Sequence, residues 1–426
     1  MKKVVIIGAG LSGLNAARRL AASGLTVEVL ERRKTVGGRV QTRTVAGFTL
    51  DRGFQVLFTK YPAARSALDY DALDLRAFTP GAVIARPGHR STLSDPRRDP
   101  GGGIASVRNP VFSPVDLLRA IQLWRHLRAT PVEEIFPGPD RPLEAYLREW
   151  GFSRSLIDDF LRPFFGGITL DRSLSTAAAV FEYTGKMLLG GDIAVPATGM
   201  GAIPTQLSGS ARAAGAEIRT ETTVRAVEAS EADSDDGVTI RTESDTIEAD
   251  AAIVATDPPM ARTLTNVSSI PTTGRGCVTQ YYSLPEAVDL ETGGRLLLNA
   301  TDSGPNQIAP MSIVAPEYAP PGQQLLAATY LGDTPADDEE LESQTQRTLA
   351  SWYPDRDLEG LDAIHTDRIE FAQFAQPPGS HAALPESDAP EGPIYLAGEY
   401  TRWSSIQGAL ESGQLAAETV FQSLDT

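Results

Sequence analysis

Hydrophobic residues recur along this chain in two patterns, short unbroken runs and longer stretches with helical spacing. The runs at 4–7 (VVII), 251–255 (AAIVA) and 394–397 (IYLA) are apolar at every position. Such runs are typical of strands buried on both faces of a parallel sheet. Between them, apolar positions three and four residues apart predict helices. These helices are expected at 115–129, 143–150, 153–161, 175–189, 203–214, 345–352 and 407–424.

A second group of segments alternates apolar and polar residues, which predicts strands with one exposed face. The stretch 86–114 is rich in Pro, Gly, Arg and Ser, so we expect an irregular loop there. The expected strands are 217–220, 223–227, 238–242, 246–248, 276–284, 295–299, 312–315 and 324–331.

The first apolar run leads into a glycine-rich turn. Gly8, Gly10 and Gly13 fit the pattern G-x-G-x-x-G. In that pattern the first glycine permits a tight turn, the second lets a pyrophosphate approach the backbone, and the third lets the helix pack on the strand. Ser12 lies at the start of the helix, and Glu31 ends the next strand, where a ribose-binding acid belongs. The segment predicts a dinucleotide-binding βαβ unit, and a glycine-rich turn in an ordinary βαβ unit is the alternative.

Composition excludes several classes of protein. The chain has 426 residues, of which 41% are hydrophobic, and suits about two domains. No apolar run approaches the roughly 20 residues of a membrane span, and the apolar start is too short for a signal peptide, so we expect a cytoplasmic protein. The single cysteine, Cys277, precludes an internal disulfide. The four histidines lack the spacing of metal ligands, so no metal site is expected.

The charge of the chain is strongly negative. A formal net charge of −17 argues against nucleic acid as a partner. Only five of the 38 basic residues are lysines, and acidic runs occur at 231–236 and 337–340. This pattern predicts an acidic, halophilic type of surface that is adapted to salt. Solvated loops in a protein from a GC-rich genome are the alternative.

The helix expected at 115–129 has an apolar face formed by Leu118, Ile121, Leu123 and Trp124, with its arginines elsewhere. Such a face usually packs in a protein core. Contact with a membrane surface is the alternative.

Three further motifs give the chain a resemblance to a known family. Residues 31–43 (ERRKTVGGRVQTR) join the strand-ending acid to Gly37-Gly38-Arg39. Residues 48–55 (FTLDRGFQ) read F-x-x-D-x-G, and residues 395–413 (YLAGEYTRWSSIQGALESG) form a closing motif. In these motifs the chain resembles the FAD-dependent oxidoreductases of the flavin amine oxidase and phytoene desaturase superfamily. The segment 163–168 (PFFGGI) is similar to the desaturase-like branch.

The resemblance implies an α/β fold of two domains. A Rossmann-type FAD-binding domain is combined with a discontinuous α+β substrate domain, as in the glutathione-reductase-like FAD fold. The FAD-binding domain is expected at 1–80, 195–260 and 390–426, and the substrate domain at 81–194 and 261–389.

The resemblance also implies roles for single residues. Arg39 neutralises the pyrophosphate, Glu399 binds the ribityl chain, and the helix N-terminus after it faces the flavin pyrimidine edge. Val224 meets the adenine through its backbone, and Asp51 either touches the cofactor or braces a turn. The residues expected to bind FAD are Gly8, Gly10, Ser12, Gly13, Glu31, Arg32, Gly38, Arg39, Gly53, Phe54, Val224, Gly398, Glu399, Ile406 and Gly408.

The chain departs from the family's amine oxidases at two points. Ile406 stands where they usually carry an aromatic residue of an amine-binding cage. The lysine that they often carry near flavin N5 has no evident counterpart, since only Lys186 lies beyond the first sixty residues. Cys277 lies far from the closing motif in sequence, so FAD is expected to be bound non-covalently. Tyr400, Trp403 and Ile406 are the candidates for the substrate pocket, and packing at the domain interface is the alternative for Tyr400 and Trp403. No catalytic acid or base is assigned.

The expected function is that of an FAD-dependent dehydrogenase, desaturase or oxidase. Its substrate is expected to be a mainly hydrophobic small molecule, carotenoid- or porphyrinogen-like, or an amine. There is no second glycine motif for NAD(P)H, so electrons are expected to leave to a diffusible acceptor, oxygen or a quinone. A redox-neutral flavin-dependent isomerase and a non-catalytic binding protein on the same fold are the alternatives.

Overall fold

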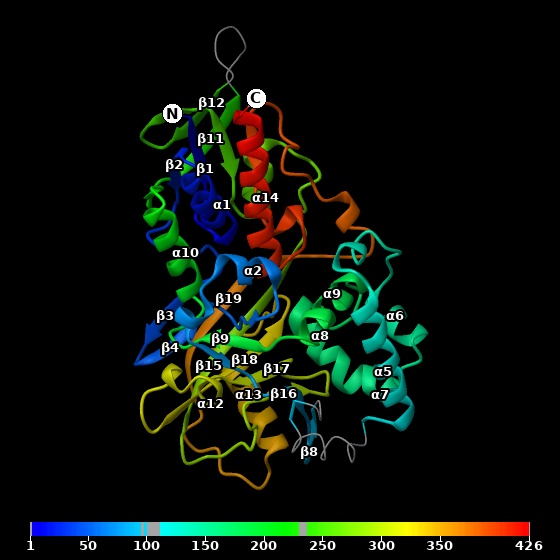
Figure 1. Ribbon diagram of the computed structural model, residues 1–426. Coiled ribbons are helices and arrows are strands. Elements are labelled where there is room, and N and C mark those ends of the chain that lie inside the picture. Colours follow the sequence, from blue (N-terminus) through cyan, green and yellow to red (C-terminus); the bar gives the residue numbers. More distant parts are fainter. Residues whose placement is uncertain (1, 95–97, 100–110, 230–236, 426) are drawn as a thin grey trace.

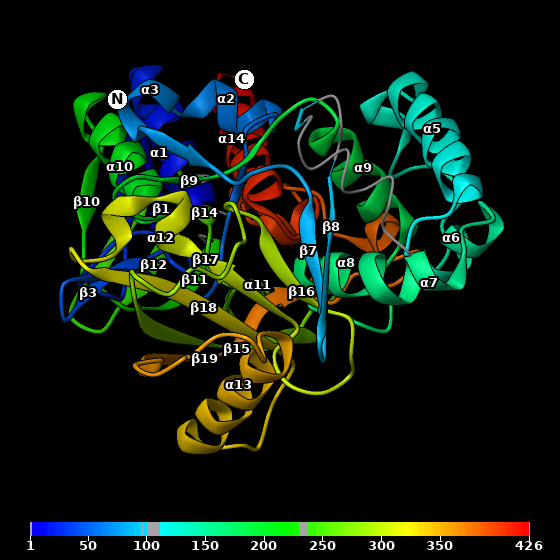
Figure 2. The ribbon, with the colours of Figure 1, turned by 90° about the horizontal axis from the view of Figure 1, so that it is seen from below.

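The computed structural model describes residues 2–94, 98–99, 111–229 and 237–425. The molecule is elongated, with a parallel sheet at the end that holds both termini and a larger sheet at the other end (Figure 1). A group of helices lies beside the larger sheet, as the view from below also shows (Figure 2). The acidic run at 231–236 lies outside the described residues.

The parallel sheet is assembled from segments far apart in sequence. Its strands pair in the order β10–β2–β1–β14–β20, and all four pairings are parallel. Both faces of the sheet are covered, which explains the unbroken apolar runs in β1, β14 and β20. These strands are β1 (Lys3–Ile7), β2 (Thr26–Leu30), β10 (Glu217–Arg219), β14 (Ala251–Val254) and β20 (Ile394–Leu396).

The two faces of this sheet are covered by different structures. Val4 and Ile6 pack against three helices, whereas Val5 and Ile7 pack against a small antiparallel sheet and one further helix. The helices on the first face are α1 (Leu11–Ala22), α10 (Ala202–Ala213) and α14 (Ile406–Leu424). The second face carries β11 (Val224–Ala229), β12 (Val238–Thr242), β13 (Thr246–Ala249) and α11 (Pro258–Thr265). This is the predicted Rossmann-type arrangement.

The larger sheet has seven strands, in the order β19–β15–β18–β17–β16–β7–β8. All its pairings are antiparallel except that of β16 with β7. An α+β region therefore accompanies the parallel sheet, which confirms the predicted fold class, while the predicted domain boundaries stay a prediction. The strands are β7 (Ala82–Arg86), β8 (His89–Leu93), β15 (Gly274–Pro285), β16 (Leu296–Asn299), β17 (Gln307–Pro310), β18 (Gln323–Leu331) and β19 (Asp362–Phe374).

Shorter elements complete the described fold. The small strands are β3 (Thr42–Val45), β4 (Phe48–Asp51), β5 (Leu57–Phe58), β6 (Leu75–Ala77) and β9 (Ile193–Pro196). The remaining helices are α2 (Pro62–Ala67), α3 (Tyr70–Leu73), α5 (Pro114–Ala129), α6 (Leu143–Glu149), α7 (Arg154–Leu156), α8 (Arg162–Thr169), α9 (Ala178–Leu188), α12 (Met311–Val314) and α13 (Asp338–Trp352).

Two expectations about local structure are wrong, and several strands are missed. Residues 312–315 are not a strand, because β17 ends at Pro310 and the chain turns at once into α12. The stretch 86–114 is not irregular throughout, since it contains β8; its residues 95–97 and 100–110 lie outside the described ones. In the larger sheet, β7, β17 and β19 have no predicted counterpart. Both β8 and β19 are edges of the larger sheet and carry many polar residues, so they lack the apolar pattern that marks a strand.

The helix α5 buries less of its apolar face than the sequence predicts. Leu123 and Leu127 are buried, but Leu118 and Ile121 are 54% and 44% exposed. The expectation that this face packs in the core is therefore wrong for Leu118 and Ile121. Among the described residues, no helix is long and apolar enough to cross a membrane.

Candidate functional site

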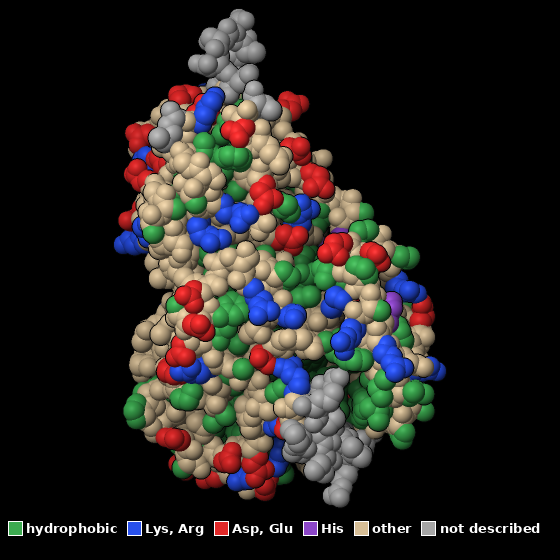
Figure 3. Space-filling model, in the orientation of Figure 1, with side chains coloured by type: hydrophobic (Ala, Val, Ile, Leu, Met, Phe, Trp, Pro, Cys, Tyr) green, Lys and Arg blue, Asp and Glu red, His purple; other side chains and the backbone are tan. Residues whose placement is uncertain are grey.

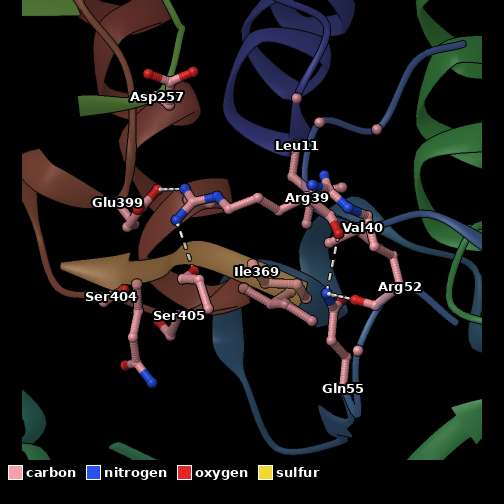
Figure 4. Close-up of a pocket in the computed structure, with 18 of the residues that line it drawn as sticks. Leu11, Arg39, Val40, Arg52, Gln55, Asp257, Ile369, Glu399, Ser404 and Ser405 are labelled. Carbon is pink, nitrogen blue, oxygen red and sulfur yellow. Dashed lines mark hydrogen bonds and ion pairs between the residues drawn. The ribbon is translucent and has the colours of Figure 1, made fainter. Parts of the chain in front are cut away.

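A cavity of about 490 Å³ lies where the carboxyl ends of the parallel strands meet the larger sheet. In open α/β sheets this edge is the usual ligand site. Residues from the end of β1, the end of β2 and the start of α14 line it, together with residues of α8, β15, β16, β17 and β19. Figure 4 shows the part of the cavity around Arg39.

Some residues of the glycine turn line the cavity, and others allow the helix α1 to pack on β1. Gly8, Gly10 and Ser12 line the cavity, and Gly8 has φ +108°, a left-handed conformation that favours glycine. A Cβ on Gly10 would meet no atom within 4 Å, so the backbone is open to a ligand there. Gly13 does not line the cavity. A Cβ at Gly13 would lie 2.1 Å from Gly8 O, so this glycine serves the close packing of α1 on β1.

The carboxylate of Glu31 is buried at the end of β2 and lines the cavity. Its Oε2 accepts a hydrogen bond from Ala9 N and its Oε1 accepts one from Arg33 N, both at 2.9 Å. Glu31 therefore orders the glycine turn, and each oxygen keeps a lone pair for a further donor. Arg32 also lines the cavity and pairs with Asp257 across it at 3.3 Å.

Arg39 joins three distant segments of the chain. Its Nη2 donates to Glu399 Oε2 at 2.5 Å and its Nη1 donates to Ala372 O at 3.0 Å. The side chains of Arg39 and Glu399 both line the cavity (Figure 4). Burial acts to lower the pKa of Arg39, but the charge and hydrogen bond of Glu399 outweigh it and hold this pKa above its usual value. Glu399 Oε1 is buried and has no hydrogen-bond partner among the described residues. This oxygen can therefore accept a hydrogen bond from a ligand.

The F-x-x-D-x-G segment places Gly53 and Phe54 on the cavity wall, whereas Asp51 does not line the cavity. Asp51 is buried and accepts hydrogen bonds from Thr42 Oγ1 at 2.5 Å, from Met200 N at 2.7 Å and from Tyr318 Oη at 3.0 Å. Burial raises the pKa of Asp51 to about 6. Of the two roles left open by the sequence, the structure gives Asp51 that of a brace.

The N-terminus of α14 opens toward the cavity. Ser405 Oγ caps the helix by accepting from Gly408 N at 2.8 Å, and Ser405 and Ile406 line the cavity. Gly398 and Gly408 do not line it. A Cβ on Gly408 would lie 2.0 Å from Trp403 O, so this position permits close packing of the turn.

Two of the three candidate pocket residues reach the cavity. Trp403 and Ile406 line it, and the buried Trp403 Nε1 has no hydrogen-bond partner among the described residues. Tyr400 does not line the cavity. It is fully buried in a hydrophobic cluster and its hydroxyl donates to Val254 O at 3.1 Å, so of its two expected roles the structure favours packing. Residues 399–401 form a single turn of 3-10 helix, in which successive side chains point in different directions, and the sequence alone does not resolve this turn.

Many cavity residues are not among the predicted site residues, and three of them on the side of the larger sheet carry polar or thiol groups. Gln376 and Gln307 are buried and line the cavity, and Cys277 lines it from β15. Burial raises the pKa of the Cys277 thiol to about 11, so it is neutral at pH 7. These residues lie in strands and loops of the larger sheet that no sequence motif marks. Val224 and Gly38, which motifs do mark, line the cavity as well.

Charge is distributed unevenly over the cavity wall. The described lining residues from segments 163–193 and 277–376 are all uncharged; we call this part the neutral half. The remaining part, at the edge of the parallel sheet and in segments next to it, carries all the charged lining residues of the described chain, namely Glu31, Arg32, Arg33, Arg39, Arg52, Arg225, Asp257 and Glu399. No lysine lines the cavity in the described chain; Lys186 instead donates to backbone carbonyls at the end of α5.

The charged part fits FAD in three respects. The backbone at Gly10 leaves room for a pyrophosphate, Glu399 offers an unused acceptor for a hydroxyl, and the N-terminus of α14 offers free N–H groups.

Comparison with known proteins agrees with this geometry. A family model described as flavin containing amine oxidoreductase matches residues 11–421. The chain is 40% identical over 78 residues to 4,4'-diapolycopene oxygenase from Methylomonas sp, covering 16% of this chain and 15% of that protein. It is 54% identical over 54 residues to putrescine oxidase from Kocuria rosea, covering 13% of this chain and 11% of that protein. These matches thus span a small part of either relative.

The fold is shared with solved structures over the whole chain. The crystal structure of a putative protoporphyrinogen oxidase from Exiguobacterium sp. 255-15 has a TM-score of 0.71 at 20% identity, covering 99% of each chain. An oxidoreductase from Methanosarcina mazei has a TM-score of 0.75 at 19% identity, covering 99% of this chain and 100% of that one.

Proposed function

Because this chain belongs to the flavin containing amine oxidoreductases, whose cofactor is FAD, we propose that it oxidises an uncharged, mainly apolar substrate. The bound flavin supplies the hydride acceptor. The protein binds the cofactor along the charged part of the cavity and holds the substrate in the neutral half. This is a dehydrogenase, desaturase or oxidase activity.

The observation that carries this proposal is the absence of charge among the described residues of the neutral half. A buried ammonium or carboxylate group needs a partner of opposite charge, since burying it unpaired costs several kcal/mol or more. Diamines, amino acids and porphyrinogens with several carboxylates would meet no such partner here. An uncharged, carotenoid-like molecule meets mainly apolar contacts there, which Phe164, Ile168 and Leu298 provide.

The chain's own residues have binding and positioning tasks. Glu31 orders the glycine turn and has acceptor capacity for a ribose hydroxyl, and Glu399 has a free oxygen for the ribityl chain. Arg39 fixes Glu399 in place, and it also adds positive charge near the phosphates. The apolar wall excludes water from the reacting carbon. We propose non-covalent FAD, because the Cys277 thiol is neutral and buried.

Anaerobic reduction of the bound flavin tests the substrate class. The protein is purified with FAD and mixed, without oxygen, with an uncharged carotenoid in detergent micelles, a porphyrinogen, putrescine or an L-amino acid. We expect the carotenoid alone to bleach the visible flavin spectrum. Comparable bleaching by putrescine or the amino acid would overturn the proposal. Reoxidation by oxygen and by a quinone then identifies the acceptor.

The same preparation separates the two alternatives. A redox-neutral isomerase would turn over with reduced FAD and consume no acceptor. A non-catalytic binding protein would take up no flavin after native purification and addition of FAD. The open backbone at Gly10 and the free Glu399 Oε1 argue against that second alternative.

We also propose that α5 contacts a membrane surface, from which an apolar substrate enters. Four of the six exposed large hydrophobic residues of the described chain lie on α5, namely Val115, Leu117, Leu118 and Ile121. Hydrophobic side chains gather in this region, at the lower right of Figure 3. Arg125 and Arg128, both exposed, continue α5 toward its C-terminus, where they complement anionic headgroups.

Co-sedimentation with vesicles of phosphatidylcholine and an anionic lipid tests this surface. The double variant L118E/I121E is expected to lose binding, since two carboxylates would have to enter the interface. The variant I313E, which changes an equally exposed residue of α12, is the matched control and should bind normally. Failure of the unaltered protein to bind would contradict the proposal.

A further inference from the structure

Gln307 is a buried polar residue in the neutral half of the cavity. It begins β17 and is only 3% exposed. It lines the cavity together with Leu296, Leu298 and Gly167, which carry no polar side-chain atoms. A buried amide in such surroundings needs a hydrogen-bond partner for each of its ends.

The neighbours of Gln307 fix the orientation of its amide. An Arg172 guanidinium nitrogen donates to Asn306 Oδ1 at 2.9 Å. Asn306 Nδ2 in turn donates to Pro163 O at 2.8 Å and to Gln307 Oε1. A guanidinium can only donate and a carbonyl can only accept, so Asn306 cannot be turned over without losing both of these bonds. Gln307 therefore directs its oxygen toward Asn306 and its Nε2 away from it.

The Nε2 group of Gln307 is the donor of this network that makes no hydrogen bond to the described residues. It has no hydrogen-bond partner among the described residues, although Gln307 faces the cavity. An amide donor left unpaired in apolar surroundings is unfavourable, and a ligand acceptor would satisfy it. Arg172 does not bring its charge into the cavity, because its terminal nitrogens donate to Asn306 and to the carbonyls of Asn299 and Thr301.

We infer that Gln307 determines specificity by donating a hydrogen bond to a neutral oxygen of an otherwise apolar substrate. The oxygen is that of a carbonyl, hydroxyl or ether group. A carboxylate does not fit, since Gln307 supplies a neutral donor and the neutral half supplies no cation among its described residues. This inference rests on the proposed function, because it takes the neutral half as the substrate site.

Calorimetric titration with a pair of matched probes tests the inference. Decan-2-one and 2-methyldec-1-ene have the same shape, but the second carries a methylene group in place of the carbonyl oxygen. We expect the FAD-loaded protein to bind the ketone about tenfold or more tightly than the alkene, since only the ketone satisfies the Gln307 donor. Decanoate, the charged probe, is expected to bind more weakly than the ketone.

The variant Q307M removes the donor and keeps the length of the side chain. Its ketone-to-alkene affinity ratio should fall to near one, mainly through weaker binding of the ketone. The variant Q344M, at a partly exposed position on α13 outside the cavity, is the control and should keep the preference. Equal affinities in the unaltered protein, or a ketone preference that survives in Q307M, would overturn the inference.

The experiment separates this inference from the proposed function. The flavin content of each preparation is measured by absorbance before titration. Absence of flavin counts against the proposed function. The calorimetric signal does not depend on flavin, so the ketone preference and its loss in Q307M still decide the role of Gln307.

Discussion

At the scale of single residues, the site depends on buried polar groups that join distant parts of the chain. Arg39 follows the second strand of the parallel sheet, yet it binds Glu399 near the C-terminus and Ala372 at the end of β19. A charge-assisted pair of this kind positions both partners with a strength that a neutral pair does not reach. The free oxygen of Glu399 is therefore held in place before any ligand arrives.

A substitution at Glu31 tests whether its buried carboxylate supports FAD binding. The substitution Glu31→Gln puts an N–H donor where the backbone N–H of Ala9 or Arg33 now donates, so at least one of the two bonds is lost. Hydrogen bonds to a charged group contribute about 1.5–3 kcal/mol, so we expect FAD affinity to fall by about tenfold to a hundredfold. Titration of the apoprotein with FAD, followed by flavin fluorescence, measures this change.

Glu28 provides a matched control on the same strand. Its carboxylate pairs with Arg219 at 2.7 Å and with Lys3 at 3.0 Å, outside the cavity. Glu28→Gln should leave FAD affinity unchanged and affect only stability. Equal losses of affinity in both variants would contradict the special role of Glu31.

The sequence identifies site residues that lie close together within one short motif. It does not identify residues that reach the site only through the pairing of distant strands. The glycine turn and Glu31 belong to one βαβ unit, so their spacing alone predicts that they meet at one sheet edge. Gln307 and Gln376 face the same cavity only because β17 and the end of β19 are paired in a particular register with their neighbours. No short pattern in the sequence contains that register. Tyr400 and Trp403 show the same limit within a single turn.

At the scale of secondary-structure elements, the sequence predicts a strand where the apolar run is unbroken. The strands β1, β14 and β20 appear as such runs and are predicted. The strands β7 and β17 are also buried but are not among the predicted strands, so burial alone does not make a strand recognisable in the sequence. The edge strands β8 and β19 contain charged and polar residues on exposed positions, so no local pattern separates them from loops. The helix α5 was predicted with nearly correct ends, but which of its apolar residues are buried depends on tertiary packing.

The turn between β1 and α1 gives a prediction about an element, because its glycines have separable roles. Gly10 has ordinary backbone angles, φ −74° and ψ 179°, and a Cβ there would meet no atom within 4 Å. Gly10→Ala should therefore fold with nearly unchanged thermal stability. Its methyl group would occupy the space of the pyrophosphate, so FAD affinity should fall by about tenfold or more.

Gly13→Ala is the complementary variant. Its Cβ would lie 2.1 Å from Gly8 O, so α1 has to move away from β1. Overpacking of this kind costs about 1–3 kcal/mol, and a lower midpoint of urea unfolding should report it in the absence of FAD. A Gly10→Ala protein that is less stable than Gly13→Ala without cofactor would contradict the division of roles.

At the scale of the whole molecule, charge is segregated. The net charge is −17, while the neutral half of the cavity carries no charged residue among those described. The surface also holds ion pairs, such as Arg76 with Asp74 and Glu317, and Arg241 with Glu228. Exposed pairs of this kind contribute about 0–1 kcal/mol each and weaken in salt. The repulsion among excess acids also weakens in salt, so the two effects oppose each other.

Salt dependence of stability shows which of these effects is larger. The Debye length falls from about 10 Å at 0.1 M to about 3 Å at 1 M, which removes most repulsion between exposed acids. With an excess of 17 negative charges, we expect relief of repulsion to outweigh the loss of exposed ion pairs. The midpoint of thermal unfolding, measured with FAD in excess, should then rise by a few degrees between 0.1 M and 2 M KCl.

Sucrose at matched osmolality controls for the general stabilisation by solutes that are excluded from the protein surface. A midpoint that falls in KCl would instead show that the ion pairs dominate, and the acidic runs would then be solvated loops without a role in salt adaptation.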